Sequence, residues 1–218
     1  HQRAVAAIDS GAFAEEVVPV VLPGRRGAPP RVIAVDECPR RDTSAEALAA
    51  LRPAFADPTA GGASPTVTAG NASQLADGAA AILVTSEAFA TAHGVPILAR
   101  YIASANASLA PEWLFEAPAP TIRRLLDRTG TSLNDYDLFE LNEAYAAQMV
   151  ADTHLIGWDE ARVNVHGGSI ALGHALGSTG TRILTTLVHA LRRHDGHRGI
   201  AAACLGGGEA FAVSIERP

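Results

Sequence analysis

The sequence has few cysteines, few aromatic residues and no long hydrophobic run. Its two cysteines, Cys38 and Cys204, form no CxxC pair, so a secreted disulfide framework is not expected. No apolar run approaches the roughly 20 residues that span a bilayer. The start also lacks the basic segment and apolar core of a signal peptide. These absences predict a cytoplasmic protein without a membrane segment, in which Cys204 is a free thiol.

An excess of basic residues is also lacking, because the net charge at pH 7 is −6. This balance argues against a general nucleic-acid binder. Cys, His and Asp residues do not cluster at ligand spacing, so no zinc or other metal site is expected. The one basic cluster lies within residues 24–42, which we interpret as an anion-facing surface, and its arginines are Arg25, Arg26, Arg31, Arg40 and Arg41.

The chain has 218 residues, of which 48% are hydrophobic, enough for one large or two smaller globular units. Strands are expected at residues 79–85, 97–104, 138–141, 199–204 and 210–215, and helices at 74–78, 121–130 and 142–155. Their alternation predicts an α/β protein with right-handed crossovers and helices on both faces of the sheet. The last two strands should form an antiparallel hairpin, which makes the sheet mixed.

Shorter signals mark the first half of the chain. Ser44 and Ser86 are expected to cap short helices, and residues 57–64 are rich in turn formers. Position 1 is His, the only Met is Met149, and residues 4–10 resemble a helix without a capping residue. We therefore expect that upstream sequence is missing.

Residues 163–182 combine glycines, histidines and small hydroxyl residues in one polar turn. His174 lies between Gly173 and Gly177, just before a helix, and imidazole is the usual acid or base at physiological pH. His166 is the rival candidate, and a purely structural histidine is the alternative. A phosphate loop does not fit, because neither GxxxxGK[ST] nor GxGxxG is present.

Two further clusters carry chemical groups. Cys204 precedes three glycines whose backbone N–H groups could stabilise an oxyanion, although a buried cysteine before a plain turn is an equal alternative. Asn142 follows the strand 138–141, at the edge where α/β sheets bind ligands. The alternative is that Asn142 only caps a helix, with Glu143 in its first turn.

Taken together, NEAYAAQ, VNVHGGSIALGHALGSTG and CLGGGEAFAV resemble the three C-terminal signatures of the thiolase family, in order and spacing. DECPR at residues 36–40 and VTAGNASQLADGAAA at residues 67–81 resemble its preceding segments. The resemblance implies a mixed five-stranded sheet with helices on both faces and a partial loop domain. It divides the chain into a partial loop domain at 1–74, a return segment of the N-terminal domain at 75–96 and the C-terminal domain at 97–218.

Thiolases cleave 3-ketoacyl-CoA with CoA or condense two acyl-CoA molecules. By resemblance, Cys204 is the acid/base thiol, and His174 activates the nucleophilic cysteine. Asn142 holds a water that completes one oxyanion hole, and the amide of Gly206 contributes to a second, while Ser73 and Arg40 contact CoA. CoA and acyl-CoA are substrates, and no separate cofactor is implied. The complete protein would be a homodimer or homotetramer.

The chain departs from the family pattern at several positions. Ala175 follows His174 where Pro is usual, and Glu209-Ala210 replaces the commoner Met-Gly. Neither cysteine can be the family's nucleophile, so we expect an enzyme that is inactive without its N-terminal half. The alternative is a non-catalytic module that binds CoA or forms oligomers.

Overall fold

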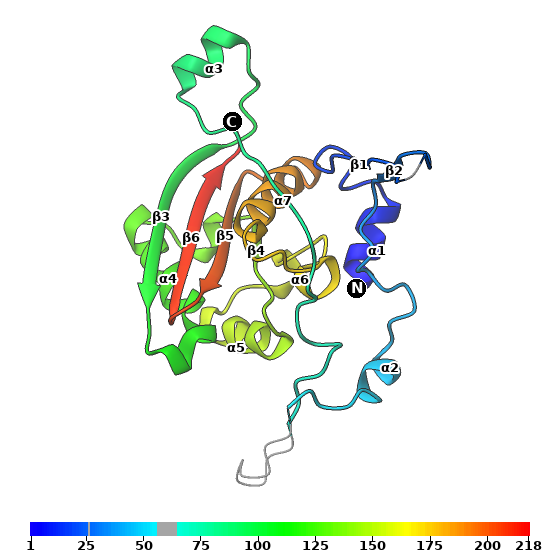
Figure 1. Cartoon of the computed structure of the whole chain (residues 1–218). Helices are drawn as coiled ribbons and strands as arrows, with labels where there is room; N and C mark the ends of the chain where they lie inside the picture. Colours follow the sequence, from blue (N-terminus) through cyan, green and yellow to red (C-terminus); the bar gives the residue numbers. More distant parts are fainter. Residues whose placement is uncertain (26, 56–64) are drawn as a thin grey trace.

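A mixed sheet forms the centre of the molecule (Figure 1). The computed structural model describes residues 1–25, 27–55 and 65–218. The sheet has the order β3-β6-β5-β4, with β3 at Arg100–Ser108, β4 at Leu138–Leu141, β5 at Arg198–Leu205 and β6 at Glu209–Glu216. Strands β4 and β5 are parallel, while β3 and β5 both pair antiparallel with β6. The mixed sheet and the terminal hairpin are thus confirmed.

The described sheet has four strands, where five were expected. Val163 forms an isolated parallel bridge with Phe139, beside the edge strand β4. Residues 79–85, expected as a buried strand, pair with no other described strand, and the helix expected at 74–78 does not form. Leu83 and Val84 are 69% and 82% exposed. Both predictions are wrong. The strand does not form because a short apolar run becomes a strand only where a neighbouring strand pairs with it.

Helices cover both faces of the sheet, as predicted (Figure 1). Helix α4 (Pro118–Thr129) packs on β3 and β6, with α5 (Ala146–Ile156) beside it, while α7 (Thr179–Arg193) packs on β4 and β5. Alternate residues of β4 serve the two faces. Phe139 and Leu141 join the core under α4, whereas Leu138 packs beneath α7 with Leu187.

The remaining elements are short. They are α1 (Gln2–Asp9), β1 (Val20–Leu22), β2 (Arg31–Ile33), α2 (Ala45–Ala49), α3 (Glu87–His93), α6 (Ser169–Leu172) and 3-10 turns at Pro111–Glu116, Leu133–Asp135 and Glu160–Arg162. Ser44 and Ser86 cap α2 and α3 through their side chains, as predicted. Helix α3 projects beyond the sheet (Figure 1). The turn-rich stretch 57–64 and Arg26 lie outside the described residues.

Two predicted boundaries shift. Strand β3 continues to Ser108, which pairs with Glu209, so the expected loop after residue 104 begins later. Helix α5 begins at Ala146 instead of residue 142, because the backbone ahead of it is bonded elsewhere. The amide of Asn142 donates to the Ala202 carbonyl at 3.0 Å. Within the described residues, no helix is long and apolar enough to cross a membrane.

Candidate active site

Asn142 and Cys204 lie at the carboxyl ends of two neighbouring parallel strands. Leu141, the last residue of β4, pairs with Ala202 of β5, and Cys204 is two residues further along β5. Helix α7 leads by a short turn into β5 and therefore runs antiparallel to it. The start of α7, with His174 just ahead of it, thus comes to the same edge as Asn142 and Cys204. This is the edge at which open α/β sheets bind ligands.

The side chain of Asn142 is held by the glycine-rich segment. Asn142 is 2% exposed, and its Oδ1 accepts a hydrogen bond from Ser169 Oγ at 2.6 Å. Its backbone carbonyl accepts from Gln148 Nε2 at 3.3 Å. The N-cap of α5 is Tyr145, so the alternative of Asn142 as a helix cap is wrong. The buried amide instead faces the histidine segment.

His174 is oriented by the first residue of α7. Its Nδ1 lies 2.8 Å from Thr179 Oγ1, and this hydroxyl donates its one proton to the Ala175 carbonyl at 2.9 Å. The hydroxyl must then accept from Nδ1–H, which leaves the lone pair on Nε2. Burial, followed by the charge of Arg182, lowers the pKa of His174. The imidazole is therefore neutral and can act as a base at Nε2.

Residues 71–75 run between the Asn142 segment and the histidine segment. The amide of Ser73 donates to the Ala144 carbonyl at 3.0 Å, and the amide of His174 donates to the Gln74 carbonyl at 2.8 Å. Gly173 has a φ of +93°, and a Cβ there would lie 2.5 Å from Ala76 Cβ. Gly173 therefore permits this close approach and does not open space around His174. Ser73, the predicted CoA contact, is thereby brought to the same edge.

Glu143 and Asn164 brace the site. Asn164 takes a positive φ of 46°, and its amide exchanges two hydrogen bonds of 2.9 Å with the backbone of Leu141. Its Nδ2 also donates to Glu143 Oε1 at 2.9 Å, while Glu143 Oε2 accepts from the amide of Ile170 at 3.1 Å. Glu143 does not lie in the first turn of a helix. It instead ties the end of β4 to the glycine-rich segment.

Cys204 is a half-buried free thiol at the start of the glycine turn. Burial raises the pKa of this thiol, and the nearby carboxyl of Asp152 raises it further. A protonated thiol can give its proton to a carbanion. Gly206, the predicted oxyanion donor, is exposed in this turn, and a Cβ there would meet no atom within 4 Å. A ligand can therefore approach the backbone closely.

Other predicted residues lie outside this cluster. His166 is 5% exposed, stacks edge-on with Phe13 and lies 3.1 Å from His194 between their Nε2 atoms. Burial lowers its pKa to about 4, which fits a neutral structural histidine. In the basic cluster, Arg31 pairs with Glu37 at 3.0 Å and Arg41 with Asp9 at 2.6 Å. Arg40 is exposed beside them, and its backbone amide donates to His1 Nδ1 at 3.1 Å.

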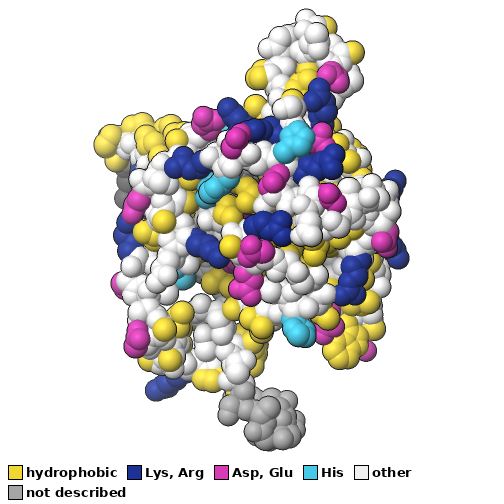
Figure 2. All heavy atoms as spheres, turned by 180° about the vertical axis from the view of Figure 1, so that it is seen from behind, with side chains coloured by type: hydrophobic (Ala, Val, Ile, Leu, Met, Phe, Trp, Pro, Cys, Tyr) yellow, Lys and Arg dark blue, Asp and Glu magenta, His cyan; other side chains and the backbone are white. Residues whose placement is uncertain are grey.

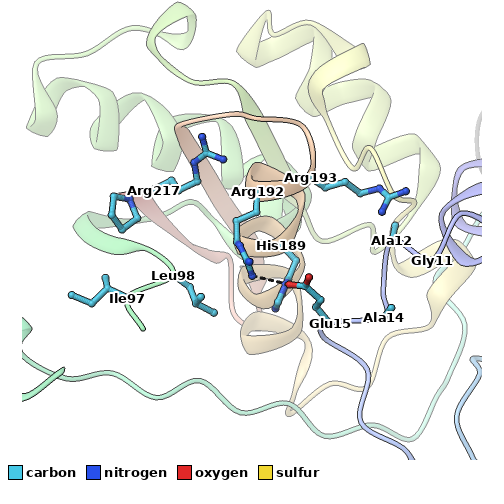
Figure 3. Close-up of a pocket in the computed structure, with 11 residues that line it drawn as sticks. Gly11, Ala12, Ala14, Glu15, Ile97, Leu98, His189, Arg192, Arg193 and Arg217 are labelled. Atoms are coloured by element: carbon cyan, nitrogen blue, oxygen red, sulfur yellow. Dashed lines mark hydrogen bonds and ion pairs between the residues drawn. The ribbon is translucent and has the colours of Figure 1, made fainter. Parts of the chain in front are cut away.

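A cavity of about 630 Å³ lies at the other end of α7 (Figure 3). His189 and Arg192 line it, ten or more residues beyond Thr179, which is roughly 15 Å along a helix. Arg192 is paired with Glu15 at 2.8 Å, and Arg217 with Asp195 at 2.6 Å. On the face seen from behind in Figure 2, acidic and basic side chains are interspersed, in keeping with these ion pairs. The cavity is therefore separate from the candidate active site.

Several residues of the site were not among the candidates that the sequence indicated, although four of them lie within the quoted motifs. They are Ser169, Arg182, Thr179, Gln148 and Asn164, which hold Asn142, His174 and the end of β4. The available signals were these motifs and the small hydroxyl residues within the glycine-rich stretch. The residues that they hold are distant in sequence. Knowing where the strands end therefore does not identify these supporting residues.

A thiol, a neutral imidazole and a buried amide at one edge of a mixed sheet are the groups that α/β acyl-transfer enzymes use. The family model for the thiolase N-terminal domain matches residues 1–88, and the model for the thiolase C-terminal domain matches residues 95–217. The chain therefore belongs to the thiolase family.

Known relatives agree with this assignment. An acetyl-CoA acetyltransferase of Pseudomonas aeruginosa is 47% identical over 217 residues, which cover 100% of this chain and 53% of the relative. The structure of the Bacillus anthracis acetyl-CoA acetyltransferase superimposes with a TM-score of 0.93 at 42% identity, over 100% of this chain and 53% of that one. The structure of human mitochondrial 3-ketoacyl-CoA thiolase in complex with CoA superimposes with a TM-score of 0.85 at 36% identity, over 100% of this chain and 52% of that one. The chain thus spans about half the length of these relatives.

Proposed function

We propose that the polypeptide to which this chain belongs transfers acyl groups between CoA thioesters. The reaction would be thiolytic cleavage of 3-ketoacyl-CoA or Claisen condensation of acyl-CoA. The observation that carries this proposal is the joint placement of Asn142, Cys204 and the His174 segment at the carboxyl edge of β4 and β5. The names of the relatives support the same chemistry.

Each group has a role that fits its surroundings. His174 Nε2 would take the proton of a nucleophilic thiol, since its lone pair is free. Cys204 would protonate the enolate released by cleavage, or remove the α-proton in condensation. Asn142 would hold a water that completes one oxyanion hole, and the amide of Gly206 would contribute to the second; each preorganised donor of this kind contributes about 3 kcal/mol. Ser73 and Arg40 would contact CoA, which enters as a substrate.

The proposal requires a nucleophilic cysteine outside this chain. Cys204 is assigned to proton transfer, and Cys38 packs behind the histidine segment, with its Sγ 3.4 Å from where a Cβ of Gly173 would lie. Without another thiol, acylation has no acceptor. We therefore expect the isolated chain to be inactive. A cytoplasmic location and a homodimer or homotetramer of the complete protein remain predictions, the first supported by two free thiols.

The test uses the full-length polypeptide with acetoacetyl-CoA, acetyl-CoA and CoA. We expect Cys204→Ala to abolish condensation but to leave acylation of the upstream cysteine detectable by mass spectrometry. Cys38→Ala is the matched control and should keep both activities. Loss of acylation in Cys204→Ala would refute the role assigned to this thiol. Binding of CoA without any turnover by the wild type would instead support the non-catalytic module.

A further inference from the structure

A chain of hydrogen bonds leads from α7 to the side chain of Asn142. Arg182 Nη2 donates to Ser169 Oγ at 3.1 Å, and Ser169 Oγ donates to Asn142 Oδ1 at 2.6 Å. Ser169 is fully buried and Asn142 is 2% exposed, so water does not compete for these bonds. The three residues come from α7, α6 and the end of β4. The chain thus joins three separate elements behind the site.

The order of donors and acceptors fixes the orientation of the amide. A guanidinium only donates, so the oxygen of Ser169 accepts from Arg182 and its single proton remains for Asn142. Only Oδ1 of Asn142 can accept that proton. The Nδ2 group is therefore turned away from Ser169, and it makes no hydrogen bond within the part of the chain that the structure describes. A donor is left free for a ligand.

The positive charge of Arg182 strengthens this donor. Its Nη1 lies 3.7 Å from Glu140 Oε2, without a hydrogen bond. Burial raises the pKa of Glu140 to about 8, so this carboxyl is mostly protonated at neutral pH and does not neutralise Arg182. In a chain of hydrogen bonds each bond polarises the next. Electron density is thereby drawn toward Oδ1, which leaves the Nδ2 protons more positive.

We propose that Arg182 and Ser169 are positioning residues that hold the amide of Asn142 with its Nδ2 donor free to bind the water that completes the oxyanion hole for the thioester oxygen. This inference rests on the proposed function, because it assumes that Asn142 stabilises an oxyanion. Neither Arg182 nor Ser169 needs to touch the substrate. Their contribution is the direction and strength of a donor that belongs to another residue.

The experiment measures thiolysis of acetoacetyl-CoA by the full-length polypeptide. Ser169→Ala should lower kcat about tenfold, because the amide loses its fixed orientation, and should change KM by less than about twofold. Ser169→Thr keeps the hydroxyl and should recover most of kcat. The matched control is Ser214→Ala. Ser214 is another buried serine, 1% exposed, bonded to the Tyr136 hydroxyl at 3.1 Å and distant from Cys204 on β6, so kcat should be unchanged.

A double-mutant cycle separates a positioning role from a general structural one. If Ser169 acts through Asn142, the double variant S169A/N142A should have the same kcat as N142A. Equal losses from S169A in both backgrounds would overturn the proposal. If S169A does not fold, R182K provides the same cycle with N142A. A wild type without turnover would refute the proposed function itself, whereas an active wild type with unchanged S169A would refute only this inference.

Discussion

Glu140 gives the molecule a stability that depends on pH. It is 2% exposed under α7, and both of its carboxylate oxygens lack a hydrogen bond within the described residues. Burial raises its pKa from the usual 4.5 to about 8, although the charge of Arg182 opposes this. Between these two values the native state keeps a proton that the unfolded chain has lost. The free energy of unfolding must therefore fall as the pH rises.

The size of the effect follows from the width of this window. One such group changes the free energy of unfolding by at most about 1.4 kcal/mol per pH unit. Between pH 5.5 and 7.5 the loss should be about 2 to 3 kcal/mol. Glu140→Gln keeps the shape of the neutral acid but cannot ionise, so it should be more stable than the wild type by about 1.4 kcal/mol at pH 5.5 and by about 4 kcal/mol at pH 7.5.

Urea unfolding followed by circular dichroism at pH 5.5, 6.5 and 7.5 measures this difference. Glu16 and Asp152 have pKa values raised by burial to about 7, so the variant keeps part of the slope. Glu216→Gln is the control, because the hydrogen bond from Arg198 lowers the pKa of Glu216 and places its titration below this window. Equal slopes for the wild type and Glu140→Gln would refute the reasoning.

Two substitutions that disturb the backbone give further predictions, and thermal or urea unfolding measures the loss of stability in both. Asn164→Ala should cost about 2 to 4 kcal/mol, because it leaves the buried backbone groups of Leu141 unpaired, and a loss below about 1 kcal/mol would contradict this. Gly208→Ala should cost at least about 2 kcal/mol, since its φ is +97° and a Cβ would lie 2.4 Å from the Leu109 carbonyl oxygen. Gly206→Ala, with open space around it, is the matched control, and equal losses would refute the strain.

The sequence alone locates the edge of the sheet that carries the site. The ends of the strands before Asn142 and at Cys204 are readable because each is a short apolar run followed by polar or glycine residues. The caps Ser44 and Ser86 are equally local. Ser169 and Arg182 could not be predicted as partners of Asn142, since 27 residues and two elements separate Asn142 from Ser169. Such contacts depend on how α6 and α7 pack, which periodicity does not specify.

The failure at residues 79–85 has a different cause. Their composition favours a strand, but backbone groups form a strand only with a partner, and the described residues supply none. The same reasoning explains why α5 begins late. The backbone of residues 142–146 is already bonded to Ala202 and to residues 71–73, so the helix cannot start there. In both places tertiary pairing decides the outcome, against the local preference of the sequence.

Arg182 links the two halves of the candidate site. Burial is the main cause of the lowered pKa of His174, and the charge of Arg182 is the second cause. The Nη2 of Arg182 also begins the hydrogen-bond chain to Asn142. Positive charge favours both a neutral imidazole and a polarised N–H donor, and one guanidinium in the first turn of α7 adds it to the effect of burial. A lysine at this position would keep the charge but lose the planar fork that reaches Ser169. The charge of Arg182 acts on His174 through space, whereas the orientation of the Asn142 amide also depends on the shape of the arginine side chain that reaches Ser169.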